Sequence, residues 1–147
     1  MQRVLLAMVL VGATSCNRPA ATEGRLAAIE ANLKSLRPLS GRERQTPYTA
    51  YFQQGDLQLI EEQPKERTAV HNRYYFHHGE LFYYRQLHQG QVTRQFVIDK
   101  NGLVKNTYPA PFPKDDLQQV SAHADALKNA ALTRAGQVFD FPIMRNR

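Results

Sequence analysis

The sequence predicts an α+β fold, in which an antiparallel β-meander of about five strands is flanked by an N-terminal and a C-terminal helix. Three observations favour it. Residues 48–108 contain short strand-like runs separated by glycine-containing turns. Apolar residues recur at helical spacing before and after this region. The 147-residue chain, 42% of it hydrophobic, has the size and composition of one globular domain.

The first predicted helix covers residues 22–37. Thr22 suits the N-cap position. Pro38 favours a stop after Arg37, because the residue before a proline is disfavoured in the helical conformation. The apolar residues at helical spacing are Leu26, Ile29, Leu33 and Leu36. A polar loop is expected to follow, up to residue 47.

The predicted sheet occupies residues 48–108. Its strands are expected at residues 48–54, 57–63, 68–77, 81–88 and 91–98, with residues 103–107 as a candidate sixth strand. The connections that supply positive-φ residues for tight turns are Gln54-Gly55-Asp56, His78-Gly79, Gln89-Gly90 and Asn101-Gly102. Such turns join strands that are neighbours in the sequence, so an antiparallel meander is expected.

The side-chain pattern also predicts a register. If Gln89-Gly90 is a two-residue turn, apolar residues pair across it on one face, which would be the core face of the sheet. The expected pairs are Leu87 with Val92, Tyr83 with Phe96, and Leu81 with Ile98. A turn at His78-Gly79 adds Tyr74 and Phe76 to the same face.

The second predicted helix covers residues 114–135. Asp115 and Asp116 suit its first turn, because the helix dipole favours negative charge there. Gly136 suits its C-terminal stop. Its narrow apolar stripe consists of Leu117, Val120, Ala124, Leu127 and Ala131. The apolar tail, residues 137–144, is expected to pack against the sheet or to form part of an interface.

The N-terminus has the features of a removable export signal. After Arg3 comes an apolar run, residues 4–11, that is much shorter than the roughly 20 residues needed to cross a bilayer. The box Ala13-Thr14-Ser15-Cys16 then resembles the cleavage site of a bacterial lipoprotein (type II signal peptide). An ordinary secreted protein with a chance cysteine is the alternative.

The lipoprotein resemblance implies a processing scheme. Residues 1–15 would be a signal peptide, and residues 16–21 a lipidated tether with acyl chains on Cys16. In such lipoproteins an aspartate directly after the cysteine favours retention in the inner membrane. This position holds Asn17, so the resemblance implies an outer-membrane location facing the periplasm. The stretch Asn72–Leu81 resembles the strand–turn–strand units of small uncharacterised bacterial lipoproteins.

Composition and motifs exclude several classes of function. The single cysteine excludes an intramolecular disulfide and a multi-cysteine zinc site. The formal charge of +6 suits an anionic partner such as a lipid headgroup, whereas export argues against nucleic acid. The sequence has no nucleophile elbow, no glycine-rich phosphate loop and no metalloprotease motif. We therefore expect neither an enzyme nor a bound cofactor.

Three clusters of residues are candidate sites. Four histidines, His71, His77, His78 and His88, and nearby Glu80 more readily form a solvated polar face than a metal site, because no ligand spacing matches a closed site. Arg85 and Arg94 fall opposite each other in the expected register, which makes them a candidate anion site. The alternative is that they are structural and reach water or pair with a carboxylate such as that of Asp125.

The third cluster lies on the opposite face of the expected sheet. It is a candidate binding face of aromatic and basic side chains, formed by Arg73, Tyr75, Phe82 and Tyr84. The alternative is that the first helix covers this face.

These observations together indicate a membrane-anchored, non-catalytic binding or scaffold protein of the cell envelope. Its expected partner is another envelope protein or an anionic headgroup. The alternative is a small-ligand carrier or hydrolase with an anion pocket near Arg85 and Arg94.

Overall fold

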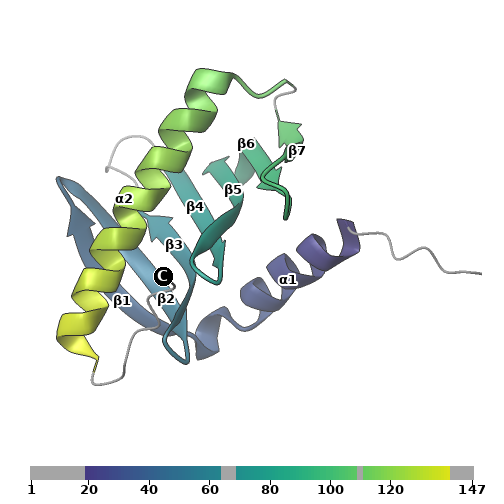
Figure 1. Cartoon of the computed structure of the whole chain (residues 1–147). Coiled ribbons are helices and arrows are strands. Elements are labelled where there is room, and N and C mark those ends of the chain that lie inside the picture. Colours follow the sequence, from purple (N-terminus) through teal and green to yellow (C-terminus); the bar gives the residue numbers. More distant parts are fainter. Residues whose placement is uncertain (1–18, 64–68, 109–110, 140–147) are drawn as a thin grey trace, which may run out of the picture.

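The structure, a computed structural model, describes residues 19–63, 69–108 and 111–139. Within these residues, seven strands form one open antiparallel sheet that lies between two α-helices (Figure 1). This confirms the broad α+β prediction, with more strands than expected. The expected signal peptide and Cys16 lie outside the described residues.

Strands that are consecutive in the sequence lie side by side in the sheet, from β1 to β7. They are β1 (Arg37–Glu43), β2 (Thr46–Gln53), β3 (Asp56–Glu62), β4 (Val70–His77), β5 (Glu80–His88), β6 (Gln91–Ile98) and β7 (Val104–Tyr108). Three tight turns pair a positive-φ residue with a positive-φ glycine, at Gln54-Gly55, His78-Gly79 and Gln89-Gly90. These are turns that the sequence predicts, and the meander follows from them.

The strand that the sequence does not predict is β1, which occupies the expected loop. Pro38 and Gly41 indicate a break there, yet β1 is an edge strand, where a proline need not donate to a ladder. Gly41 lies opposite Tyr48 of β2. A Cβ at Gly41 would lie 2.5 Å from Cζ of Tyr48, so the glycine makes room for this buried ring.

The N-terminal helix differs from its expected bounds at both ends. Helix α1 (Pro19–Ala31) begins inside the expected tether and ends early, and a short 3-10 turn, η1 (Leu33–Ser35), follows. The side-chain amide of Asn32 donates to the Ala28 carbonyl at 2.9 Å, and the Ser35 hydroxyl donates to the Asn32 carbonyl at 2.7 Å. Polar side chains that bond the backbone in this way compete with continuation of a helix.

A β-bulge changes the expected register between β5 and β6. Leu87 pairs with Val92 as predicted, but the bulge between Gln86 and Leu87 shifts the pairs beyond it by one residue. Phe96 therefore pairs with Tyr84, not with Tyr83. Because side chains alternate between faces, this shift moves Tyr84 to the face on which Tyr83 was expected.

Side chains are buried on both faces of the sheet. Helix α2 (Lys114–Val138) begins where predicted, ends later, and lies across one face (Figure 1). Its fully buried side chains are Ala124, Leu127, Ala131 and Ala135, and they share one core with sheet rings that include Tyr74, Tyr84 and Phe96. Beyond α2, Phe139 of the apolar tail packs in the same core, 5.6 Å from the ring of Phe52. The rest of the tail, residues 140–144, lies outside the described residues.

A second core lies on the other face, between α1 and the sheet. Ile29 of α1 and Leu36 after η1 are buried there. The sheet contributes Leu59, Tyr75, Phe82, Tyr83 and Val97. Tyr74 of β4 and Tyr84 of β5 are thus buried under α2, whereas their neighbours Tyr75 and Tyr83 are buried under α1.

Candidate functional site

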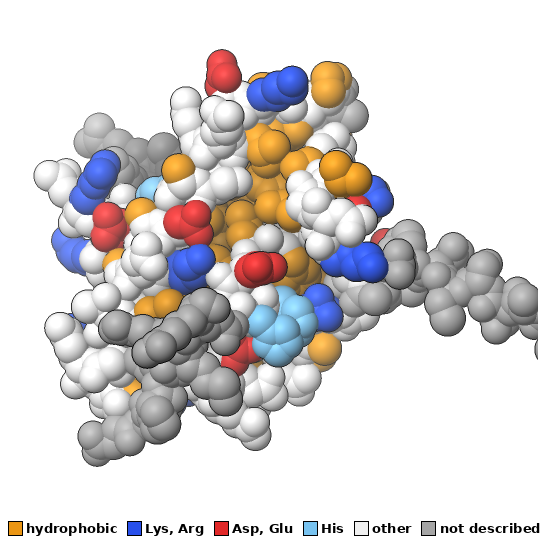
Figure 2. All heavy atoms as spheres, in the orientation of Figure 1, with side chains coloured by type: hydrophobic (Ala, Val, Ile, Leu, Met, Phe, Trp, Pro, Cys, Tyr) orange, Lys and Arg blue, Asp and Glu red, His pale blue; other side chains and the backbone are white. Residues whose placement is uncertain are grey.

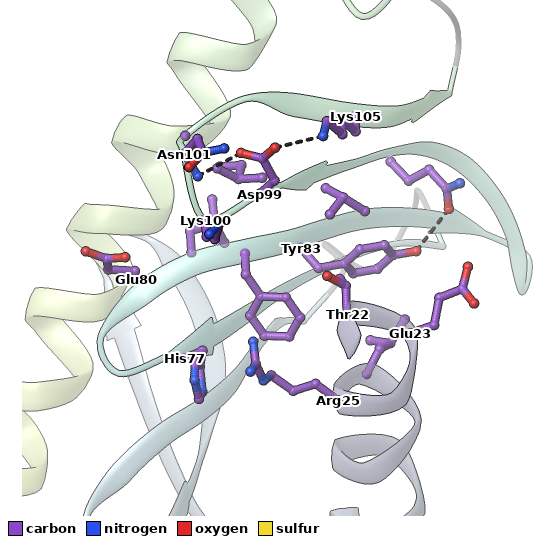
Figure 3. Close-up of a pocket in the computed structure, with 17 residues that line it drawn as sticks. Thr22, Glu23, Arg25, His77, Glu80, Tyr83, Asp99, Lys100, Asn101 and Lys105 are labelled. Carbon is purple, nitrogen blue, oxygen red and sulfur yellow. Dashed lines mark hydrogen bonds and ion pairs between the residues drawn. The ribbon is translucent and has the colours of Figure 1, made fainter. Parts of the chain in front are cut away.

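A pocket of about 710 Å³ opens at one end of the sheet. Its walls are the first half of α1, the β4–β5 turn and the β6–β7 connection (Figure 3). This volume lies within the range of small-molecule sites in proteins, roughly 300 to 1,000 Å³. The pocket is therefore large enough to hold a ligand.

The floor of the pocket is apolar. It is formed by Leu26 of α1 together with Leu81, Phe82, Tyr83, Val97 and Ile98 of β5 and β6. Figure 2 shows hydrophobic side chains within a hollow on this side of the molecule, with charged and histidine side chains around it. Neither helix covers these side chains completely at this end of the sheet, so apolar surface is available to a ligand.

One acidic group of the rim is neutralised within the protein. Asp99 pairs with Lys105 at 2.8 Å and accepts hydrogen bonds from the backbone N–H groups of Asn101 and Leu103 at 2.8 and 2.9 Å. The hydrogen bond from Lys105, with these backbone bonds, lowers the pKa of Asp99 to about 2. The β6–β7 connection is thereby held in place by its own polar groups.

Two cations of the rim have no carboxylate partner among the described residues. They are Arg25, whose guanidinium lies 5.5 Å from the centre of the Phe82 ring, and the exposed Lys100. Figure 3 shows Arg25 beside His77 and Lys100 farther away, on the β6–β7 connection. The carboxylates of Glu23 and Glu80 also lack a partner within the described residues, and both lie at the outer margins in this view.

His77 is a neutral member of this rim. Burial, followed by the positive charge of Arg25 and the neighbouring His78 ring, lowers the pKa of the His77 imidazole below its ordinary 6.5. Its ring centre lies 3.9 Å from that of His78. His77 therefore offers a hydrogen-bonding group without a charge at neutral pH.

A separate cluster of ionic groups joins α1 to the sheet. Oε1 of Glu30 accepts hydrogen bonds from Arg73 at 3.1 Å, from Arg85 at 2.7 Å and from the Tyr75 hydroxyl. Arg73 also pairs with Glu61 at 2.6 Å. The two guanidinium charges are thus matched by two carboxylates. We name this group the Glu30 cluster; its five residues are Glu30, Glu61, Arg73, Tyr75 and Arg85.

The Glu30 cluster contains two of the four residues expected on an exposed binding face, Arg73 and Tyr75. Tyr75 is 0% exposed under α1, so the expectation that helix one leaves this face open is wrong and the alternative, a covered face, holds. Tyr84 lies in the opposite core because of the bulge between β5 and β6. Arg73 is committed to ion pairs. Of the four expected residues, only Phe82 lines the pocket.

The expected placement of the two anion-site arginines is also wrong. Arg85 pairs with Gln95 in the sheet, and Arg94 with Gln86, so the two side chains point to opposite faces. Arg85 belongs to the Glu30 cluster, although its Nε–H, which is buried, has no hydrogen-bond partner in the part of the chain described. Arg94 pairs with Asp116 of α2. Asp125, the expected alternative partner, pairs with Lys128 at 2.9 Å.

A second polar cluster lies under α2, around the buried carboxylate of Glu62. One of its oxygens accepts hydrogen bonds from Asn72 at 2.8 Å and from the Tyr74 hydroxyl at 2.9 Å. The other oxygen bonds His123 Nε2. Asn72 in turn accepts a hydrogen bond from the Tyr84 hydroxyl at 3.0 Å. We name this group the Glu62 cluster; its five residues are Glu62, Asn72, Tyr74, Tyr84 and His123.

Glu62 and His123 stabilise each other's charge. Burial alone raises the pKa of the Glu62 carboxyl, but hydrogen bonds from His123, Tyr74 and Asn72 outweigh it, and the net pKa is lowered from 4.5. The hydrogen bond to Glu62 raises the pKa of His123 above 6.5. A histidine–carboxylate pair can act as a general base beside a substrate. Neither residue lines the pocket, and the pair is explained by packing of α2 on the sheet.

The remaining histidines lie at both ends of the β4–β5 hairpin. His77 is next to the turn, and His71 and His88 are exposed at the far end. Among residues 19–63, 69–108 and 111–139, no three histidine, cysteine or acidic side chains gather as metal ligands would.

Sequence reasoning did not single out Arg25, Glu30, Glu62 or His123. A signal exists for three of them. Glu30 lies on the apolar stripe of α1, one turn from Leu26 and Leu33. His123 lies one helical turn from Leu127 in α2. Glu62 lies two residues after Ile60 and therefore on the same, inner face of β3. A polar residue in an apolar pattern requires a partner, but the pattern does not name that partner.

Comparisons with known proteins add no family to this description. The sequence matches no protein-family model and no curated protein, and no solved structure matches the chain. The described part of the chain has no helix with the length and apolar character needed to cross a bilayer.

Proposed function

We propose that this chain is a lipid-anchored, non-catalytic binding protein of the bacterial cell envelope, with the pocket beside α1 as its ligand site. The anchor would be acyl chains on Cys16, as the resemblance of residues 13–16 to a lipoprotein cleavage box implies. By the same resemblance, Asn17 favours the outer membrane, with the domain facing the periplasm.

The observation that supports this proposal best is the position of α1. The helix begins at Pro19, three residues after Cys16, and its first half forms one wall of the pocket. Because three residues span at most about 10 Å, an acyl anchor on Cys16 would hold this end of α1 close to the membrane surface. The ligand site would then lie beside the membrane.

The ionisable groups support a binding role more than a catalytic one. The acids and bases under the helices are engaged with one another, in the Glu30 cluster and in the Glu62–His123 pair. Such clusters hold α1 and α2 on the sheet. The pocket, in contrast, combines a broad apolar floor with a few polar groups at its rim, as ligand-binding sites do.

The anchor is tested by substitution of Cys16 in the full chain, expressed in a Gram-negative cell. We expect the wild-type protein to sediment with membranes and to have an acylated N-terminal cysteine by mass spectrometry. Cys16→Ala should abolish the acylation and the cleavage before residue 16. Asn17→Asp is the matched control, which should leave acylation intact and shift the protein toward the inner membrane. A wild-type chain without acyl chains would contradict the proposed anchor.

The ligand site is tested with an environment-sensitive hydrophobic dye. We expect the purified full chain to increase the dye's fluorescence, and Leu26→Trp, which fills the pocket wall, to weaken dye binding about tenfold. Leu33→Trp is the control. Leu33 follows the same helix in the chain and is half-buried, but it does not line the pocket. Equal dye binding by both variants would contradict the assignment of the pocket.

A further inference from the structure

From the lining of the pocket, we infer that its ligand is a single-chain phospholipid, a lysophospholipid, taken from the adjacent membrane. The acyl chain would lie on the apolar floor, and the phosphate would bind Arg25 and Lys100. This inference rests on the proposed function and names the chemical class of its ligand.

The floor of the pocket fits a flexible hydrocarbon. It offers leucine, isoleucine and valine side chains and two aromatic rings from two strands and a helix. Contact with these side chains is non-directional and grows with the apolar area that is removed from water. The volume of about 710 Å³ is that of a site for one drug-sized ligand, which favours one acyl chain over two.

The two unpaired cations favour a phosphate. The half-buried arginines of the sheet, Arg73, Arg85 and Arg94, each have a carboxylate partner within the protein. Arg25 and Lys100 differ, because they line the pocket without such a partner among the described residues. A guanidinium and an ammonium group that face one hollow form charge-assisted hydrogen bonds with a phosphate oxygen. Neutral His77, which lies beside Arg25 in Figure 3, adds no repulsion to a ligand.

The acidic side chains of the rim do not block this site. Asp99 is already paired with Lys105. Glu23 and Glu80 are exposed and lie at opposite margins of the pocket, with Arg25 and Lys100 between them (Figure 3). A phosphate bound by Arg25 and Lys100 would therefore have one exposed carboxylate at each margin of its site.

The test uses the purified full chain in phosphatidylcholine vesicles with two photoactivatable probes. Both probes have the same diazirine-bearing acyl chain, one on lysophosphatidylglycerol and one on neutral monoacylglycerol. After irradiation, mass spectrometry locates the labelled peptides. We expect the phosphate probe to label the peptides with Leu26, Phe82 and Val97 about tenfold more than the neutral probe, because a charge-assisted hydrogen bond contributes enough for that factor.

Matched variants identify the charges that are responsible. Arg25→Gln with Lys100→Gln should reduce labelling by the phosphate probe to the level of the neutral probe. Lys34→Gln with Arg42→Gln removes the same charge from exposed positions outside the pocket and should leave labelling unchanged. Circular dichroism melting of each variant establishes that the fold is retained.

Each outcome has a separate meaning. Equal labelling of the pocket by both probes would overturn the phosphate ligand but leave the pocket as a binding site. Labelling confined to peptides outside the pocket would overturn both the lysophospholipid and the pocket as the ligand site. The state of Cys16 in the same spectra reports on the anchor independently of either result.

Discussion

At the scale of single residues, two carboxylates decide how the helices meet the sheet. Glu30 of α1 reaches two arginines and a tyrosine of the sheet, and Glu62 of β3 reaches His123 of α2. Glu62 is buried and Glu30 is partly buried, so an unpaired charge at either position would be costly. The pairing is therefore specific, because a shifted helix would leave these charges without partners.

We expect Glu30→Gln to lower the free energy of unfolding by about 2 kcal/mol, since it leaves two guanidinium groups without their shared carboxylate. Urea denaturation measures the change. Glu23→Gln is the control on the same helix, because Glu23 is exposed and has no ion pair among the described residues. Equal effects of the two substitutions would show that the Glu30 cluster does not stabilise the fold.

The Glu62–His123 pair predicts a dependence of stability on pH. The pKa of His123 is raised above 6.5 in the folded protein, so its contribution is full below pH 6.5 and is lost as the pH rises through the folded value. The pKa of Glu62 is lowered from 4.5, so its contribution is lost as the pH falls below that value. The pair therefore stabilises the fold most between these two values.

We accordingly expect the difference in unfolding free energy between wild type and His123→Gln to be largest near about pH 5.5 and to shrink by about pH 8.5. Denaturation at a series of pH values measures it. His71→Gln, at an exposed position of β4, is the control for loss of an imidazole. A difference that grows with pH would contradict the assigned ion pair.

At the scale of elements, β1 shows how a strand can lack the usual signals. It has one buried side chain, that of Leu39, and it contains both proline and glycine. An edge strand tolerates proline, and the glycine is required by the ring of Tyr48 across the pair. The strand therefore depends on its neighbour, β2, for its formation.

Two glycine substitutions separate packing from backbone entropy. Gly41→Ala should lower the unfolding free energy by about 2 kcal/mol, because the new Cβ would collide with the buried Tyr48 ring. Gly24→Ala should raise it by about 0.5 to 1 kcal/mol, because the site in α1 is open and alanine restricts the unfolded chain. Thermal denaturation of both variants measures the changes. The same sign for both would refute this account.

At the scale of the whole molecule, the sheet is the common partner of two separate cores. Helix α2 contributes four completely buried side chains to its core. Among the side chains of α1 that the structure describes, one is buried, that of Ile29. The polar Glu30 cluster supplements this small apolar contact. The two helices should therefore differ in how readily they separate from the sheet.

We expect amide hydrogens of α1 to exchange with solvent faster than those of α2 and of the central strands β4 and β5. Hydrogen–deuterium exchange with mass spectrometry measures this. Bound ligand in the pocket should slow the exchange of α1, since α1 forms one of its walls. Equal protection of both helices would indicate that the molecule opens only as one unit.

The sequence by itself determined the class of the fold, the meander, its glycine turns and the start of the C-terminal helix. These features depend on local patterns, namely side-chain alternation, helical spacing and the positive φ of turn residues. It also indicated that aromatic residues occupy both faces of the sheet. Lipidation of Cys16 stays a prediction, because residues 1–18 lie outside the described part.

Only the tertiary structure decided which side chains meet. A single bulge beside Leu87 placed Arg85 and Arg94 on opposite faces and moved Tyr84 into the core under α2. Side-chain alternation has a period of two, so one extra residue in a strand inverts every assignment beyond it. The pocket could not be predicted from the sequence either. Its walls come from α1 and from two turns that are distant in sequence and approach one another only in the folded protein.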